Sequence, residues 1–212
     1  MKLPTNPSRA RAAGFTLVEI YMVVIIFSFL VLAMVTTQLF AARIYTFAAT
    51  KLTATASARK GMNAMRDQIR QSSQVDVGIY DTTANTFSYI GNGTNQIGNA
   101  LLIMPTNPGI TNVGTVYYMN QSASNICSVV MSNGAVVPAT LASNIVVYIT
   151  NYYVFDAEDA FTNILTTYQN DRVIHIKFQF SQWEYPMASV GNGAMYDYFQ
   201  MQTRVTRRVM DY

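Results

Sequence analysis

The segment from Phe15 to Ala42 constrains the fold more than any other part of the chain. Across these 28 residues Glu19 is the single charged side chain, and the stretch from Ile20 to Val35 is interrupted only by Ser28. A helix rises about 1.5 Å per residue, so 28 residues reach about 42 Å, which exceeds the roughly 30 Å hydrocarbon core of a bilayer. The sequence therefore predicts a helix that is able to cross a membrane.

The same helix is predicted to continue well beyond this span. No Gly or Pro occurs from Phe15 through Lys60, and the apolar residues that follow recur at intervals of three or four: Ile44, Ala48, Leu52, Thr55, Ala58, Met62, Met65 and Ile69. This spacing is typical of a helix with one apolar face. We therefore expect one helix from Phe15 to Ser72, with a transmembrane or filament-core part over 15–42 and an amphipathic continuation over 43–73.

From residue 74 onward the pattern changes to short apolar runs separated by turn residues, which is typical of strands. The predicted strands are Val75–Tyr80, Thr86–Ile90, Ala100–Met104, Val113–Met119, Ile126–Met131, Ile145–Phe155, Arg172–Phe180 and Met195–Val209. The loops between them include Thr106–Gly114 and Gly191–Gly193. The expected fold is α+β, in which the second half of the helix packs on the antiparallel sheet of a head over 74–212.

Composition excludes many kinds of enzyme site. The chain has one histidine, His175, and one cysteine, Cys127, so it holds no pair of histidine ligands, no internal disulfide and no zinc site built from cysteines alone. No nucleophile, base and orienting acid can be grouped from the sequence. We expect no enzyme activity and no catalytic residue, with His175 on the more polar face of its strand and Cys127 as a buried thiol.

Charge argues against a nucleic-acid partner. The net charge of +3 equals the three cations of the first fourteen residues, Lys2, Arg9 and Arg11, and the remaining 11 cations balance 11 acids. The six cations between Arg43 and Arg70 are expected to form the solvated face of the amphipathic helix. No Lys or Arg occurs from Gln71 to Asp171, so the head lacks the basic patch that nucleic acid requires.

Glu19 is an unusual residue in its position. A carboxylate five residues into an apolar segment is costly in a membrane and indicates a function, but the span holds no cation to pair with it. A cut after Gly14 would create a cationic amine on Phe15. In staggered neighbouring chains, Glu19 of one could meet the Phe15 amine of the next, which would favour self-assembly.

The run Gly14-Phe15-Thr16-Leu17-Val18-Glu19, which follows a short basic leader, resembles the class III signal of type IV pilins and type II secretion pseudopilins. The resemblance covers about Arg11–Phe40 and implies that a prepilin peptidase and methyltransferase removes residues 1–14 and methylates Phe15. It also implies that Glu19 neutralises the Phe15 amine of a neighbour. Thr36 stands where many major pilins have a proline.

The resemblance implies a structural minor subunit of a type II secretion pseudopilus or a type IV pilus, most similar to a J-type pseudopilin or a W-type minor pilin. Its partners would be other pilins or pseudopilins in a filament or tip complex. It would cross the inner membrane once with its head in the periplasm, then join a filament in the periplasm or at the cell surface. The alternatives are a pilus-tip adhesin, or a DNA-uptake pseudopilin with a ligand-binding head.

Two simpler interpretations of the apolar span stay open. It could be a plain single-pass anchor in which Glu19 has no role. It could also be a secretory signal, although the apolar segment is long for one and no good cleavage site follows it.

The acidic run Asp156, Glu158 and Asp159 is a weak metal candidate. Calcium prefers several oxygen ligands from one loop, but the spacing here is not that of an EF-hand. A solvated turn is the expected structure, and no cofactor is expected apart from this possible calcium ion.

Overall fold

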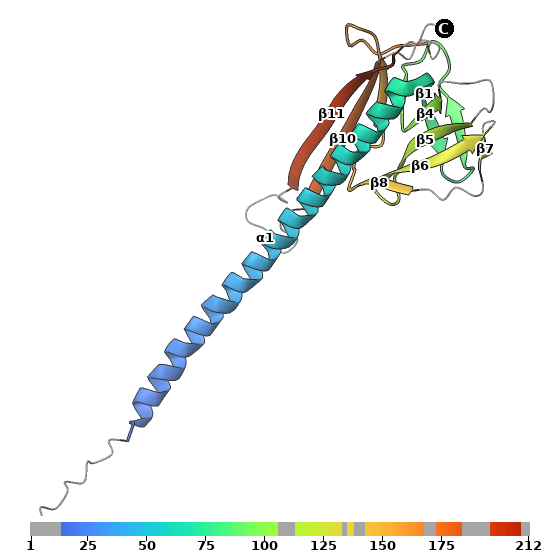
Figure 1. Ribbon diagram of the computed structural model, residues 1–212. Helices are drawn as coiled ribbons and strands as arrows, with labels where there is room; N and C mark the ends of the chain where they lie inside the picture. Colours follow the sequence, from blue (N-terminus) through green and yellow to red (C-terminus); the bar gives the residue numbers. More distant parts are fainter. Residues whose placement is uncertain are drawn as a thin grey trace, which may run out of the picture. The chain divides into compact units, whose positions relative to one another are not determined.

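A computed structural model describes residues 14–105, 113–132, 135–137, 143–167, 173–183 and 196–208 (Figure 1). The predicted leader, apart from Gly14, lies outside these residues, as do most of the predicted loop 106–114 and all of the loop 191–193. The chain divides into two compact units, one up to Ala49 and one from Thr50 onward.

The predicted long helix is confirmed as α1, Leu17–Gln71, within two residues of the expected start and one residue of the expected end. In the second unit four residues of the predicted apolar face are at most 8% exposed, Ala58, Met62, Met65 and Ile69, while Thr55 is half-buried and the unpredicted Ala54 is buried. Leu52 was expected on this face but is 72% exposed. The buried face therefore begins at Ala54, after the boundary between the two units.

The head contains two antiparallel sheets where the sequence predicted one (Figure 1). The seven-stranded sheet has the order β5-β4-β1-β2-β7-β6-β8 and consists of β1 (Ser72–Asp81), β2 (Thr86–Tyr89), β4 (Ala100–Pro105), β5 (Val113–Asn120), β6 (Asn125–Ser132), β7 (Ala135–Val136) and β8 (Ser143–Val147). The four-stranded sheet has the order β11-β10-β9-β3 and consists of β3 (Ile97–Gly98), β9 (Phe155–Glu158), β10 (Val173–Trp183) and β11 (Tyr196–Thr206).

Six strands of the larger sheet close on themselves. β5 pairs with both β4 and β6, and β7 links β6 to β2, so the pairings run in a ring through β1, β4, β5, β6, β7 and β2. All six strands contribute to one apolar cluster: Tyr80, Phe87, Ala100, Leu102, Met104, Val116, Tyr118, Cys127, Val129, Met131 and Val136. Since side chains alternate between the faces of a strand, this cluster fills the inside of the ring.

The larger core lies outside the ring. It joins the buried face of α1 to the other faces of β1, β4 and β5, through residues such as Val75, Ile103 and Tyr117. The four-stranded sheet completes it with Ile174, Ile176, Phe178, Phe180 and Val205. The predicted alternation of β10 is confirmed, because its four apolar residues share the buried face. The helix is thus an integral part of the core of the head.

The predicted single strand Ile145–Phe155 is wrong, because the structure divides it between β8 and β9 in different sheets. Tyr148 has a φ of 64°, which is incompatible with an extended strand. Asn151 then takes the place of a strand neighbour: its Nδ2 donates to the carbonyls of Tyr153 and Lys177, and its Oδ1 accepts from the N–H of Gln179. The short strands β3 and β7 were not predicted.

The chain passes from one sheet to the other at Gly98 and Asn99. The backbone of Gly98 lies directly against that of Gly78 in β1, so closely that a Cβ at Gly98 would overlap the Gly78 carbonyl. The Asn99 amide pairs with Tyr80, accepting from its N–H at 2.8 Å and donating to its carbonyl at 3.2 Å. A side chain thus replaces a strand neighbour where the two sheets meet.

Candidate functional site

The predicted motif residues lie at the start of α1. Gly14 and Phe15 precede the helix and are exposed, Phe15 by 81%. Thr16 and Glu19 bond to each other: Glu19 Oε2 accepts from the Thr16 N–H at 2.9 Å and from its hydroxyl at 3.0 Å, and the Glu19 N–H donates to that hydroxyl at 3.3 Å. This is a capping box, which satisfies N–H groups that a helix start otherwise leaves unpaired.

The capping box was not anticipated from the sequence, although its signature was present. Thr-x-x-Glu immediately before an apolar run is a recognised helix-start pattern. Glu19 therefore has a local structural partner in Thr16, in addition to the neighbouring Phe15 amine that the sequence leads us to expect.

The helix after Glu19 is suited to an apolar environment. One stretch is long and apolar enough to cross a membrane, and none of it is buried within the protein. Its hydroxyl groups are satisfied by the helix itself: Ser28 donates to the Val24 carbonyl at 2.7 Å, and Thr36 and Thr37 donate to the Ala33 carbonyl at 2.9 and 2.8 Å. Because all three hydroxyls are hydrogen-bonded within the helix, they would not oppose its transfer into lipid.

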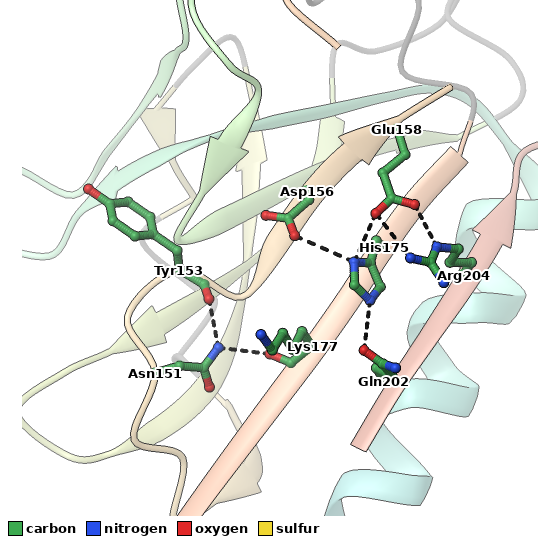
Figure 2. A network of polar contacts seen from close by, with 8 residues as sticks. All are labelled: Asn151, Tyr153, Asp156, Glu158, His175, Lys177, Gln202 and Arg204. Carbon is green, nitrogen blue, oxygen red and sulfur yellow. Dashed lines mark hydrogen bonds and ion pairs between the residues drawn. The ribbon is translucent and has the colours of Figure 1, made fainter. Parts of the chain in front are cut away.

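A second candidate site lies on the four-stranded sheet, in a network of polar side chains (Figure 2). Asp156 and Glu158 come from β9, His175 from β10, and Gln202 and Arg204 from β11. His175 lies directly opposite Asp156 on one side and Arg204 on the other. Because side chains alternate along a strand, all five point away from the core that Ile174 and Ile176 help to form.

Both ring nitrogens of His175 have partners in this network (Figure 2). Nδ1 lies 3.0 Å from Glu158 Oε1 and 3.5 Å from Asp156 Oδ2, and Nε2 lies 3.3 Å from Gln202 Oε1. Arg204 holds both oxygens of Glu158, since its Nε donates to Oε2 at 2.6 Å and its Nη2 donates to Oε1 at 3.4 Å. The histidine thus faces oxygen atoms on both sides.

His175 and its two acidic neighbours are largely withdrawn from water, whereas Gln202 and Arg204 are exposed. The side chains of Glu158 and His175 are 5% and 9% exposed, and that of Asp156 is 21% exposed. Burial raises the pKa of Asp156, an effect that His175 opposes and the Glu158 charge reinforces. The hydrogen bond to Glu158 raises the pKa of Arg204, which remains a cation at any physiological pH.

The structure separates the three acids that the sequence grouped. Asp156 and Glu158 lie together at His175, but Asp159 belongs to the next turn. Asp159 Oδ2 accepts from Asn163 Nδ2 at 2.9 Å, and Oδ1 accepts from the N–H groups of Asn163 and Phe161, both at 2.8 Å. These bonds, first that from the Asn163 side chain, lower the pKa of Asp159. Asp156 and Glu158 are two residues apart, so their side chains share one face of a strand, whereas Asp159 follows at an odd spacing. This alternation was the sequence signal that could have separated Asp159 from the other two.

The two residues expected to be structural lie where the sequence placed them. His175 is on the more polar face of its strand, although its acidic neighbours were not foreseen. Cys127 is buried inside the ring, 3.3 Å from the side-chain oxygens of Asn125 and Asn144, and burial raises the pKa of its thiol.

Comparison of the chain with protein-family models, with curated proteins and with solved structures found no match. Proposals about its function therefore depend on its own residues and their geometry.

Proposed function

We propose that the chain is the precursor of a minor subunit of a type II secretion pseudopilus or type IV pilus. A prepilin peptidase would cut it after Gly14, and its helix would anchor it once in the inner membrane with the head in the periplasm. The observation that carries the proposal is the Gly14–Glu19 motif, exposed at the start of a helix that is apolar on all sides and then enters the core of a β-rich head.

The geometry of Glu19 supports a role in assembly. Its Oε2 accepts both hydrogen bonds from Thr16, and Oε1 receives none from the part of the chain that the structure describes. A carboxylate can accept about four hydrogen bonds, so Oε1 is available to a further donor. The amine of a neighbouring Phe15 would fit this role, because a carboxylate in an apolar filament core is costly unless an opposite charge pairs with it.

The apolar helix would serve in two environments. Before assembly, lipid would cover the exposed side chains between Leu17 and Phe40. In the filament, helices of neighbouring subunits would cover the same surface. The exchange of lipid for protein contacts would leave the capping box and the self-satisfied hydroxyls unchanged.

Processing provides the direct test. We expect the intact mass of the membrane-extracted chain, co-expressed with a prepilin peptidase, to lack residues 1–14, with N-methyl-Phe15 as the first residue. The Gly14→Val variant should remain uncut, and a Cβ at this position meets nothing within 4 Å, so the fold of α1 should be preserved. An uncut wild-type chain, or a cut beyond Ala42, would instead indicate a plain anchor or a secretory signal.

The role of Glu19 can be separated from helix capping with three variants. Glu19→Ala removes the charge and the cap, Glu19→Gln removes the charge but keeps an oxygen for Thr16, and Thr16→Ala removes the hydroxyl of the cap but keeps the charge. We expect normal cleavage in all three. The fraction recovered in sheared filaments should fall about tenfold or more in both Glu19 variants, which corresponds to about 1.4 kcal/mol. Thr16→Ala should remain closer to wild type. Wild-type recovery of Glu19→Gln would contradict charge pairing and leave capping as the role of Glu19.

A further inference from the structure

The polar network of the four-stranded sheet is not explained by filament assembly. Asp156, Glu158 and His175 bring three metal-ligating atoms within 4.8 Å of one another. We propose that these three residues form a mononuclear site for a divalent ion of the zinc type, supported by Gln202 and Arg204. This proposal is independent of the proposed function.

The spacing of the donor atoms fits such an ion. Zinc binds imidazole nitrogen and carboxylate oxygen at about 2.0–2.2 Å, so neighbouring ligand atoms in a tetrahedral site lie about 3.4 Å apart. His175 Nδ1 lies 3.0 Å from Glu158 Oε1 and 3.5 Å from Asp156 Oδ2. The two carboxylate oxygens lie within 4.8 Å of each other. An ion could therefore bind between the three atoms if side-chain rotations brought these oxygens to about 3.4 Å from each other.

In the tautomer of His175 that carries its proton on Nε2, the lone pair of Nδ1 is free to bind a metal ion. A neutral imidazole carries one N–H, and both of its nitrogens here face oxygen acceptors. With Nε2–H donating to Gln202 Oε1, the lone pair of Nδ1 would point at two carboxylates unless a proton or a metal ion lay between them. This is also the arrangement of a metal-bound histidine, whose second nitrogen usually donates to a carbonyl or carboxylate.

The remaining residues complete the surroundings of a site. Arg204 donates to Glu158 Oε2 at 2.6 Å and, at the longer distance of 3.4 Å, to Oε1, and so fixes the carboxylate with Oε1 toward His175. Asp156 is the most exposed of the three ligands, which gives an ion a path from solvent and leaves room for water as a fourth ligand. Arg204 and the neighbouring Lys177 limit the net charge of the two acids.

The chemistry of the donors selects the class of ion. Calcium takes six to eight oxygen ligands and rarely nitrogen, whereas zinc and similar transition metals accept imidazole with carboxylate in sites of three protein ligands. With His175 as a ligand, the set favours zinc over the calcium ion that the sequence suggested for Asp156, Glu158 and Asp159.

The test is titration of the chelator-stripped full chain in detergent micelles with zinc sulfate at pH 7.5, followed by calorimetry. We expect one equivalent to bind, more weakly as the pH is lowered because protons compete for Nδ1. An excess of zinc of about a hundredfold over Kd should raise Tm by about 5–10 °C. X-ray absorption should report one imidazole nitrogen, oxygen ligands and no sulfur.

Variants identify the ligands. His175→Gln and Asp156→Asn should each weaken zinc binding about a hundredfold or more, and Gln202→Ala about ten- to a hundredfold. Asp159→Asn and Cys127→Ser are matched controls that should bind zinc as the wild type does. Circular dichroism of each variant without metal checks folding, and Asp156→Asn carries the test if His175→Gln does not fold.

Three results would overturn the proposal. They are the absence of saturable zinc binding, binding that persists in folded Asp156→Asn, and calcium binding as tight as zinc binding. In the first case, the network is a structural cluster in which a proton occupies Nδ1.

Discussion

Replacing Gly98 by alanine is expected to lower the free energy of unfolding by about 3 kcal/mol or more, at the upper end of overpacking effects. The added Cβ would overlap the backbone carbonyl of Gly78 and lie 2.9 Å from Val77 Cγ1. A backbone carbonyl cannot turn aside as the tip of a flexible side chain can. The two sheets would therefore have to separate where Asn99 connects them.

Gly91→Ala is the matched control for this prediction. It makes the same substitution seven residues earlier, at a position where a Cβ meets nothing within 4 Å. We expect its unfolding free energy to stay within about 0.5 kcal/mol of wild type. Urea unfolding of the detergent-solubilised chain, followed by the near-ultraviolet circular dichroism of its 14 tyrosines, measures both variants. Equal stability of the two would show that the sheets do not meet at Gly98 and Gly78.

Replacing Asp76 by asparagine is expected to stabilise the head at neutral pH by about 1–3 kcal/mol. Asp76 is 2% exposed, lies on β1 opposite Leu102 and accepts a hydrogen bond at 2.7 Å from Gln74 Nε2. Burial raises its pKa to about 6, although the hydrogen bond from Gln74 and the charge of Arg207 lower it. Asparagine keeps an oxygen for Gln74 and removes the charge that burial disfavours.

The raised pKa of Asp76 determines how the unfolding free energy changes with pH. An unfolded aspartate has a pKa of about 3.9, so between about pH 4 and pH 6 the folded state binds more protons than the unfolded state. The unfolding free energy therefore falls as the pH rises through this range, and the loss is complete above the folded pKa. Asp76→Asn should remove this contribution, with its full gain at pH 7.5 and little gain at pH 4.

Asp81→Asn serves as the control for Asp76→Asn. Asp81 is an exposed carboxylate whose pKa is lowered by hydrogen bonds from the backbone N–H groups of Thr83 and Ala84. Its replacement should bring no stabilisation at pH 7.5. A wild-type pH profile in Asp76→Asn would mean that Asp76 is already solvated in the native head.

The helix and most strands could be predicted because each has a regular apolar period. The uninterrupted apolar span and the spacing of three or four residues after it predicted α1 to within two residues, and strict alternation predicted the faces of β10. The failure at Ile145–Phe155 has a specific cause. Tyr148 adopts a positive φ, which is uncommon for tyrosine and has no local sequence signal. Alternation also does not say which strands pair, so neither the second sheet nor the closed ring could be deduced.

The candidate site was found only in part, for a similar reason. Sequence adjacency grouped Asp159 with Asp156 and Glu158, whereas strand register brings in His175 from seventeen residues beyond Glu158. Only the pairing of β9 with β10 and of β10 with β11 joins these residues to Arg204. Such pairings depend on the whole sheet. The Thr16–Glu19 cap, by contrast, was local and could have been predicted.

The burial of α1 in the head has a mechanical consequence. Ala54 to Ile69 spans about 22 Å of helix at 1.5 Å per residue, and the buried side chains along it belong to one core with residues of both sheets. A load applied along this part of the helix would act on the whole row of contacts at once, as shear, and would not peel them apart one by one. Extraction of the helix would expose the core of the head to water. Under tension, this part of the helix would therefore separate from the head only when the head itself unfolds.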